Sequence, residues 1–449
     1  MWTGRAEALQ PSAGRASSAV VDRLFLNVFA LVGALLGVAN VALAWRVFGT
    51  GSTGDLWMMA LAVVQAFVLL SQVGVEQVAV FAAQARALGV SDGERFDRDS
   101  LTWGLISGLA FALLMLLVLP AVVLTFAQGF GIDARHALGA TLMPLLLQVA
   151  VAPALYVLRQ QLLLNQRARW SVLLGNTFGA MQCLALIAAL VAPSATPQQL
   201  ALAVGAGCAI VVVAAVLALG APGAGRRWPA WTPILAFIRA SVALRLTHSA
   251  HNFLVVLITN SELSSGTSGT VALFQYVKRV ADGLCAVSVG PHLAVYHADQ
   301  ATAWAQRDRA GFAANIRAYL GSALPLLALA TGLFLAGAWL FNASPVGSLA
   351  PSAVALSLFW LLLAWQALIA VETVPAGVLV LENRAGAMLL VNGVYIGLFY
   401  LGVQWLVGGS DVGITVAALS LGCQVLSLAL FSQIGWAMHR RHFRVRRDA

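Results

Sequence analysis

Residues 199–219 read QLALAVGAGCAIVVVAAVLAL, an apolar stretch without a charged residue. As an α-helix this stretch would be roughly 30 Å long, which is the thickness of the hydrocarbon core of a bilayer. The residues that follow, 220–232 (GAPGAGRRWPAWT), bring an arginine pair and two tryptophans, which are typical of the membrane–water interface. The sequence here therefore predicts a membrane-spanning helix that ends close to residue 219.

The same pattern recurs along the whole chain. Apolar residues make up 60% of the 449 residues and charged residues only 10%, whereas a soluble domain carries about 25% charged residues. We therefore predict an all-α polytopic membrane protein with about twelve transmembrane helices. The expected spans are 24–45, 57–83, 101–126, 139–161, 170–192, 199–219, 234–260, 270–297, 319–341, 352–380, 385–407 and 413–438.

The basic residues predict the orientation of these spans. Twenty of the 26 lysines and arginines fall in the ends and connections on one side, and the connections on the other side hold only Arg46 and Arg135. Because basic loops stay in the cytoplasm, both termini are expected there, in a bacterial inner membrane. The charges lie at segment ends and not on one basic face, so membrane lipids are the expected partners and nucleic acid is excluded. A cleaved signal peptide is the alternative for the first span, but its length favours an uncleaved helix.

Two internal matches indicate a duplication with a spacing of about 215 residues. Residues 74–81 (GVEQVAVF) resemble 290–296 (GPHLAVY), and 164–168 (LNQRA) resemble 381–385 (LENRA). Six spans per half is an even number, so the two halves would share one orientation and be related by an axis along the membrane normal, with a central cleft between them. The predicted domains are an N-terminal lobe (1–219), a cytoplasmic connector (220–232) and a C-terminal lobe (233–449) with a basic tail.

The seventh span carries a polar stripe. Ser241, Arg245, His248, Asn252 and Thr259 lie on one face of a helix, and such a stripe cannot face lipid. Arg245, His248 and Asn252 are therefore candidate substrate-binding residues. The alternative is packing against polar partners, which for a histidine is as common as a functional role.

The eighth span carries Gln275, Lys278, Arg279 and Asp282. Lys278 and Arg279 fall roughly 12–13 Å along the helix, close to the bilayer midplane, where a charge costs about 2.5–3.5 kcal/mol. An ion pair of Asp282 with one of the two cations would explain part of this set structurally, yet one positive charge would remain. Gln275, Lys278 and Arg279 are therefore added to the candidate substrate-binding residues.

Three acidic residues, Glu76, Asp282 and Glu372, are candidates for coupling or gating. For Glu76 and Glu372, pairing at the interface or between the lobes is the structural alternative. The prolines Pro144, Pro153, Pro325 and Pro375 are expected to interrupt their spans. The four cysteines lie in apolar segments without metal-ligand spacing, so neither a metal nor another cofactor is expected.

Two segments resemble a known superfamily. Residues 45–51 (WRVFGTG), followed by Asp55, resemble the turn after the first span in MurJ-type lipid II flippases, and residues 272–280 (ALFQYVKRV) resemble the segment that holds a cavity arginine in that family. The chain is thus similar to the exporter superfamily of MurJ-type flippases, Wzx-type oligosaccharide flippases and MATE drug exporters. The resemblance implies two rocking six-helix lobes and places Arg279 at the cavity arginine.

The resemblance implies transport and no enzymatic activity. Asn40 falls near a position where the MurJ pattern has an arginine, and twelve spans differ from its usual fourteen, so the expected function is a Wzx-like flippase for a lipid-diphosphate-linked glycan. The expected partners are this anionic substrate and proteins of envelope-polysaccharide synthesis. Two alternatives remain: a cation-coupled MATE-like exporter of small molecules, for which Glu76 or Asp282 would have to serve, and a membrane scaffold of a polysaccharide-synthesis complex.

Overall fold

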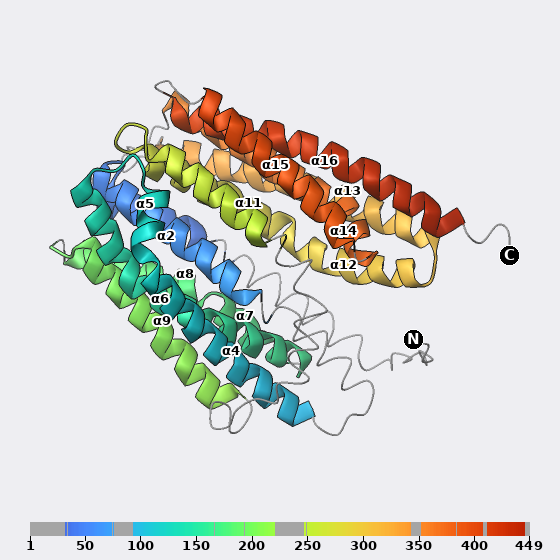
Figure 1. The fold of residues 1–449 in the computed structure, drawn as a ribbon, viewed down its shortest axis with the longest axis horizontal. Helices are drawn as coiled ribbons and strands as arrows, with labels where there is room; N and C mark the ends of the chain where they lie inside the picture. The colour runs from blue at the N-terminus through green and yellow to red at the C-terminus, as the bar shows by residue number, and fades with distance from the viewer. Residues whose placement is uncertain are drawn as a thin grey trace.

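The structure is a computed structural model. It describes residues 32–33, 35–73, 75, 93–165, 167–192, 194–220, 247, 249–342, 352–382, 384–406 and 411–444, and every regular element in these ranges is a helix. The helices form two bundles that run side by side at one end and separate toward the other (Figure 1). The fold is thus the predicted all-α, two-lobe arrangement of a multi-pass membrane protein.

The first bundle contains a helical segment Leu35–Phe48 and the helices from α2 to α9. Their bounds are α2 Ser52–Gln72, α4 Gly93–Leu117, α5 Leu119–Phe126, α6 Ile132–Leu164, α7 Ala168–Gly175, α8 Thr177–Val191 and α9 Pro197–Leu219. The long helix α6 lies at the centre of the first bundle. Glycines on the neighbouring helices α4 and α9 let their backbones approach α6 closely. A Cβ atom on Gly108 of α4 would lie 2.1 Å from the Ala150 carbonyl oxygen, and one on Gly205 of α9 would lie 2.1 Å from that of Pro144. Such small-residue contacts are a common way to pack helices in membranes.

The second bundle contains helical residues 249–263 and the helices from α11 to α16. Their bounds are α11 Thr270–Ser288, α12 Gly290–Ala305, α13 Arg309–Asn342, α14 Ala353–Leu381, α15 Ala385–Leu406 and α16 Val412–Arg444. Here α14 holds the central place that α6 holds in the first bundle, and it packs along α16. The separation of the two bundles agrees with the predicted lobes 1–219 and 233–449, but most of the connector 220–232 lies outside the described residues, so these boundaries stay a prediction.

The internal repeat has a structural counterpart at the second pair of matched segments. The backbone N–H of Arg167 donates to the Leu162 carbonyl at 2.7 Å, and the N–H of Arg384 donates to the Leu379 carbonyl at 2.9 Å. In both turns the carbonyl of the arginine then accepts from residues three and four positions later, which starts the next helix. The first pair cannot be compared in this way, because 76–81 is outside the described part of the chain.

Most predicted spans overlap the observed helices, although 57–83 extends beyond the end of α2 at Gln72 and 101–126 is interrupted at Val118. Eight helices are long and apolar enough to cross a membrane, and a ninth results if α7 and α8, bent by 47°, form one span. Of the three remaining predicted spans, 24–45 and 234–260 are described in part, and 270–297 corresponds to α11 and α12.

Helix breaks occur at other prolines than expected. The prediction for Pro144, Pro153, Pro325 and Pro375 is wrong, because α6, α13 and α14 continue through them. The breaks at Val118 and Val289 instead precede prolines in the first turns of α5 and α12. A proline in a first turn lacks only an N–H that has no helical partner there, so these positions suit a new helix start.

The tight contact between α6 and α9 yields a stability prediction. Gly205→Ala forces a Cβ atom against the fixed Pro144 carbonyl oxygen, and we expect it to lower the free energy of unfolding by about 1–3 kcal/mol. Gly207→Ala on the same helix meets only the flexible end of Met181, whose Sδ would lie 3.0 Å away, and should be tolerated better. Thermal unfolding midpoints of the purified variants measure the difference, and equal midpoints would contradict this account of the packing.

Candidate functional site

The two bundles are joined by a carboxylate at a helix terminus. Asp55 lies in the first turn of α2, and its two oxygens accept hydrogen bonds from the backbone N–H groups of Gly269 (2.6 Å) and Ala272 (2.7 Å) at the start of α11. Its side chain is almost fully buried, with 4% exposed. The N-terminus of a helix carries a partial positive charge and free N–H groups, so a buried carboxylate is well placed there. Asp55 of the first bundle therefore caps a helix of the second.

Glycines allow the backbones to approach at this point. Gly269 has a φ of 97°, and a Cβ atom on it would lie 2.0 Å from the Thr50 carbonyl oxygen. The Tyr276 hydroxyl donates to the Gly49 carbonyl at 3.2 Å, and its ring packs on Trp45 with 5.3 Å between centroids. The two segments that carry the sequence resemblance, 45–55 and 272–280, are thus in direct contact.

Further contacts join the two bundles next to this point and farther along α2. The N–H of Gly129, after α5, donates to the Ser264 hydroxyl at 2.9 Å. The ring of Phe253 stacks on Phe67 of α2 at 5.8 Å and meets Phe126 of α5 edge-on at 5.9 Å. We call this region, formed by the starts of α2 and α11, the end of α5 and residues 253–264, the lobe junction.

A polar face of α11 runs from the lobe junction toward the end where the bundles separate. Gln275, Lys278, Arg279 and Asp282 follow one another at offsets 0, 3, 4 and 7, so they share one helix face. Gln275 is buried and donates to Asn260 at 2.9 Å, whereas the side chains of Lys278 and Asp282 are 24% and 38% exposed. Charged groups this deep in a span cannot face lipid, and the partners described for Lys278 and Asp282 outside α11 lie on α14. We call the boundary between the two bundles beside α11 the seam.

The charges on this face are not balanced among the described residues. The Lys278 ammonium pairs with Asp282 at 2.5 Å. Arg279 is half-buried and has no hydrogen bond or salt bridge to any residue in the described ranges, although Asp282 and Tyr276 are near enough to act on its charge. The expected ion pair therefore forms between Asp282 and Lys278. Arg279 is the cation that this pair leaves without a counter-charge.

The Lys278–Asp282 pair is connected to the core of the second bundle. The second oxygen of Asp282 accepts from Gln366 of α14 at 2.5 Å, and the Lys278 ammonium lies 5.7 Å from the ring centroid of Trp365. The Trp365 indole donates to Gln424 of α16 at 3.1 Å. A polar chain therefore crosses from α11 through α14 to α16.

This chain ends at a second carboxylate, because the Gln424 amide donates to Glu372 at 2.6 Å. The structural alternative for Glu372 is pairing at the membrane interface or between the lobes. Its partner Gln424 belongs to the same bundle, so it does not join the lobes. Two of the three acids expected to couple or gate transport are thus members of one network.

Three of the other predicted site residues, Arg245, His248 and Glu76, lie outside the described residues. Asn252 is half-buried in helix 249–263, most of which belongs to the lobe junction. Gln275 is engaged by Asn260, so binding a ligand would require it to exchange this partner.

The roles of Asp55, Gln366 and Gln424 were not predicted from the sequence. The available signals were an acid in the first turn of a helix after a glycine-rich turn, and amides within otherwise apolar spans. In the described ranges, no group of three or more His, Cys, Asp or Glu residues could hold a metal ion.

Comparison with known proteins identifies the fold. No protein-family model and no curated sequence matches the chain. Among solved structures, an inward-facing multidrug resistance MATE family transporter matches 92% of this chain and 99% of its own length, with 15% identity and a TM-score of 0.66. The lipid II flippase MurJ in an inward closed conformation matches 94% of this chain and 90% of its own length, with 11% identity and a TM-score of 0.67.

An outward-facing MATE family transporter matches 93% of this chain and 96% of its own length, with 14% identity and a lower TM-score of 0.52. The chain therefore has the fold of the superfamily that the sequence resembles. At this level of identity the likeness concerns the fold alone.

The capping contact yields a prediction for Asp55→Asn. The amide keeps one acceptor oxygen but turns an NH₂ group toward a backbone N–H, and it lacks the charge that the helix terminus favours. Because hydrogen bonds to charged groups contribute about 1.5–3 kcal/mol, we expect the free energy of unfolding to fall by about this amount. Thermal unfolding of the purified protein measures it. Asp133→Asn is the matched control, since Asp133 is exposed in the first turn of α6. Equal stability of the two variants would show that the cap contributes nothing.

Proposed function

We propose that the chain is an inner-membrane flippase, which moves a lipid-diphosphate-linked oligosaccharide or a similar cell-envelope glycan precursor across the bilayer. The observation that carries the proposal is the excess positive charge on the polar face of α11. Of its two cations, Lys278 is paired with Asp282, and Arg279 has no described partner. An unpaired cation within a membrane span is so costly that a bound anion is the natural compensation.

A diphosphate headgroup fits this charge. The guanidinium of Arg279 can bind phosphate oxygens with two parallel hydrogen bonds, and the predicted Arg245 would add a second such group. Lys278 could exchange Asp282 for a phosphate, and the predicted His248 and Asn252 would hydrogen-bond sugar hydroxyls. The lipid tail would stay in the bilayer, so that only the polar head enters the seam.

Transport would proceed by alternating access between the two lobes. In the present arrangement the lobe junction is closed and the bundles separate at the other end, where the arginine-rich turns lie (Figure 1). If the arginine-rich side is cytoplasmic, this is an inward-facing state, and the higher TM-score to the inward-facing than to the outward-facing MATE structure supports that reading. Opening toward the outside would require the Asp55 cap to break.

A cation-coupled exporter of small molecules is the second candidate. The chain of polar groups from Asp282 to Glu372 favours it, because buried carboxylates in a transporter core can take up a proton or a cation and change their partners. A scaffold role in a polysaccharide-synthesis complex would use the same polar groups as protein contacts.

Transport in proteoliposomes tests the proposal. With a fluorescent lipid-diphosphate-linked disaccharide as probe, Arg279→Gln should slow transfer at least about tenfold, because one charge-assisted phosphate contact is worth roughly 1.5–3 kcal/mol. Arg317→Gln is the control, since Arg317 is exposed on α13, outside the seam.

Arg245→Gln and Lys278→Gln extend the test to the other cations of the proposed site. Equal transfer by Arg279→Gln and the control would refute the cationic seam. Transfer of a small organic cation, together with no transfer of the glycan lipid, would establish the exporter in place of the flippase.

A further inference from the structure

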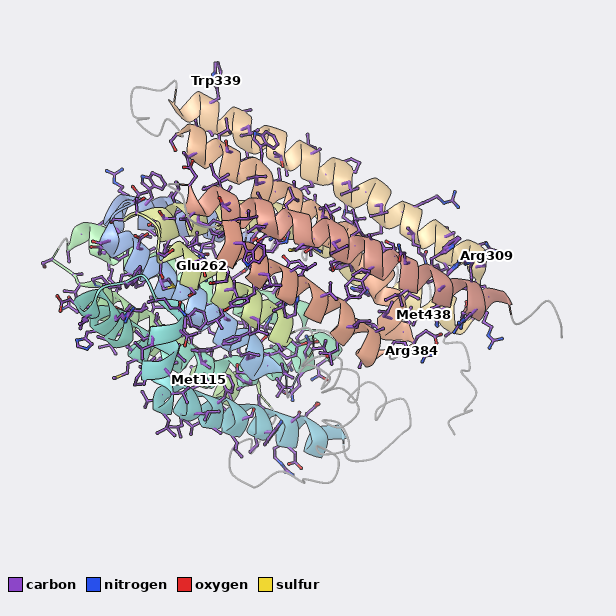
Figure 2. The ribbon with its side chains drawn as sticks, turned by 45° about the horizontal axis from the view of Figure 1, so that its top comes forward. Met115, Glu262, Arg309, Trp339, Arg384 and Met438 are labelled. Carbon is purple, nitrogen blue, oxygen red and sulfur yellow. The ribbon has the colours of Figure 1, made fainter. Side chains whose placement is uncertain are left out.

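A pocket lies in the second bundle, at its end away from the lobe junction. It has a volume of about 360 Å³ and is lined by Arg307, Glu382, Arg384, Met438, Arg441 and His442. Figure 2 shows Arg384 and Met438 at this end, opposite the labelled Glu262 and Trp339. We call it the basic pocket. All its lining residues belong to the second bundle, so it is separate from the seam described above.

Three segments that are distant in sequence supply the lining. Arg307 lies in the turn between α12 and α13, Arg384 in the turn between α14 and α15, and Arg441 close to the end of α16. The spans α13 to α16 begin or end at this level. The pocket therefore lies at the depth of the lipid headgroups, where it is open to ligands from the membrane surface and from water.

The pocket carries excess positive charge. Glu382 is the one carboxylate in its lining, and it faces His442 at 3.4 Å. Three arginines against one carboxylate leave two positive charges if His442 is neutral. None of the three has a salt bridge to a described residue. Like charges held around one cavity repel each other unless an anion lies between them.

The wall of the pocket is rigid. The ring of His442 stacks on Trp304 with 3.9 Å between centroids and 15° between planes, and its Nε2 donates to the Trp304 carbonyl oxygen at 3.0 Å. Phe312 and Phe443 pack around Trp304. Arg307 and Arg441 are therefore next to a fixed aromatic cluster that joins α12, α13 and α16.

Arg307 has an unusual backbone. Its φ of 55° is in the left-handed region, which usually holds glycine at the end of a helix. Two hydrogen bonds stabilise this conformation: the Arg307 N–H donates to the Trp304 carbonyl, and the Asp308 N–H donates to the Ala303 carbonyl. This backbone conformation costs less for glycine than for arginine, so the cation is placed beside the pocket at a conformational cost. Residues with such unusual backbone angles often mark functional sites.

We propose that the basic pocket is a binding site for a phosphate group, with the three guanidinium groups as its ligands. Guanidinium matches phosphate oxygens in geometry and charge. Anionic lipid headgroups and soluble phosphate esters share this chemistry. The position at headgroup depth favours an anionic phospholipid, since basic pockets between membrane helices bind such headgroups. Occupancy would tie the ends of α12, α14 and α16 together.

Titration of the purified full-length protein in neutral detergent tests the site. The readout is the thermal unfolding midpoint against added phosphatidylglycerol, phosphatidylcholine and glycerol phosphate, and native mass spectrometry counts the retained lipid. Arg384→Gln/Arg441→Gln should need at least about tenfold more phosphatidylglycerol for half-saturation than the unmodified protein. The control is Arg317→Gln/Arg440→Gln, which removes the same charge from exposed positions at this end, outside the pocket lining; it should match the unmodified protein within about twofold.

The probes separate the two phosphate sources. A shift with phosphatidylglycerol alone identifies a lipid headgroup, and a shift with glycerol phosphate that disappears in the pocket variant identifies a soluble ester. If the two double variants bound phosphatidylglycerol equally weakly, the effect would come from general surface charge, and the proposal would be overturned. The lack of any shift of the unfolding midpoint with phosphatidylglycerol or glycerol phosphate would also overturn it. Should the double variant not fold, Arg307→Gln replaces it, because this side chain is exposed in a turn.

Discussion

The arrangement of the two bundles depends on one carboxylate at a helix terminus. Asp55 holds the start of α11 by two backbone hydrogen bonds in a nearly water-free place, and the glycines beside it let the two backbones meet. This contact fixes both the position of α11 and its rotation about its own axis. The polar face of the same helix, with Lys278, Arg279 and Asp282, meets Trp365 and Gln366 of α14. A helix held at one end by a breakable cap is also suited to a rocking motion.

The charges on α11 connect this architecture to a function. Lys278 and Asp282 neutralise each other and lead into the network of Gln366, Trp365, Gln424 and Glu372. Arg279 adds a charge that no described residue neutralises. In a medium of low dielectric constant such an imbalance favours an anionic ligand.

The sequence was informative where one physical constraint dominates. Hydrocarbon thickness determines span length, so most predicted spans overlap the described helices, and the matched turns at Arg167 and Arg384 have the same hydrogen bonds. Contacts across the fold could not be predicted: the 45–55 and 272–280 segments were identified separately, but nothing local shows that Asp55 caps α11. Helix breaks were also misplaced, because a proline within a helix is tolerated when neighbouring helices hold it, whereas one in a first turn allows a new start.

The central claim is that the Asp55 cap holds the two bundles together at the lobe junction while they lie apart at the other end. Distances between pairs of spin labels test it most directly, in a protein without its four native cysteines. One pair at Gln128 and Ser265 spans the junction, and one at Asn165 and Gln306 spans the opposite end; all four residues are exposed. The account predicts that Asp55→Asn lengthens the junction distance and shortens the other in the same sample. Unchanged distances, or a longer junction distance with no change at the opposite end, would contradict it.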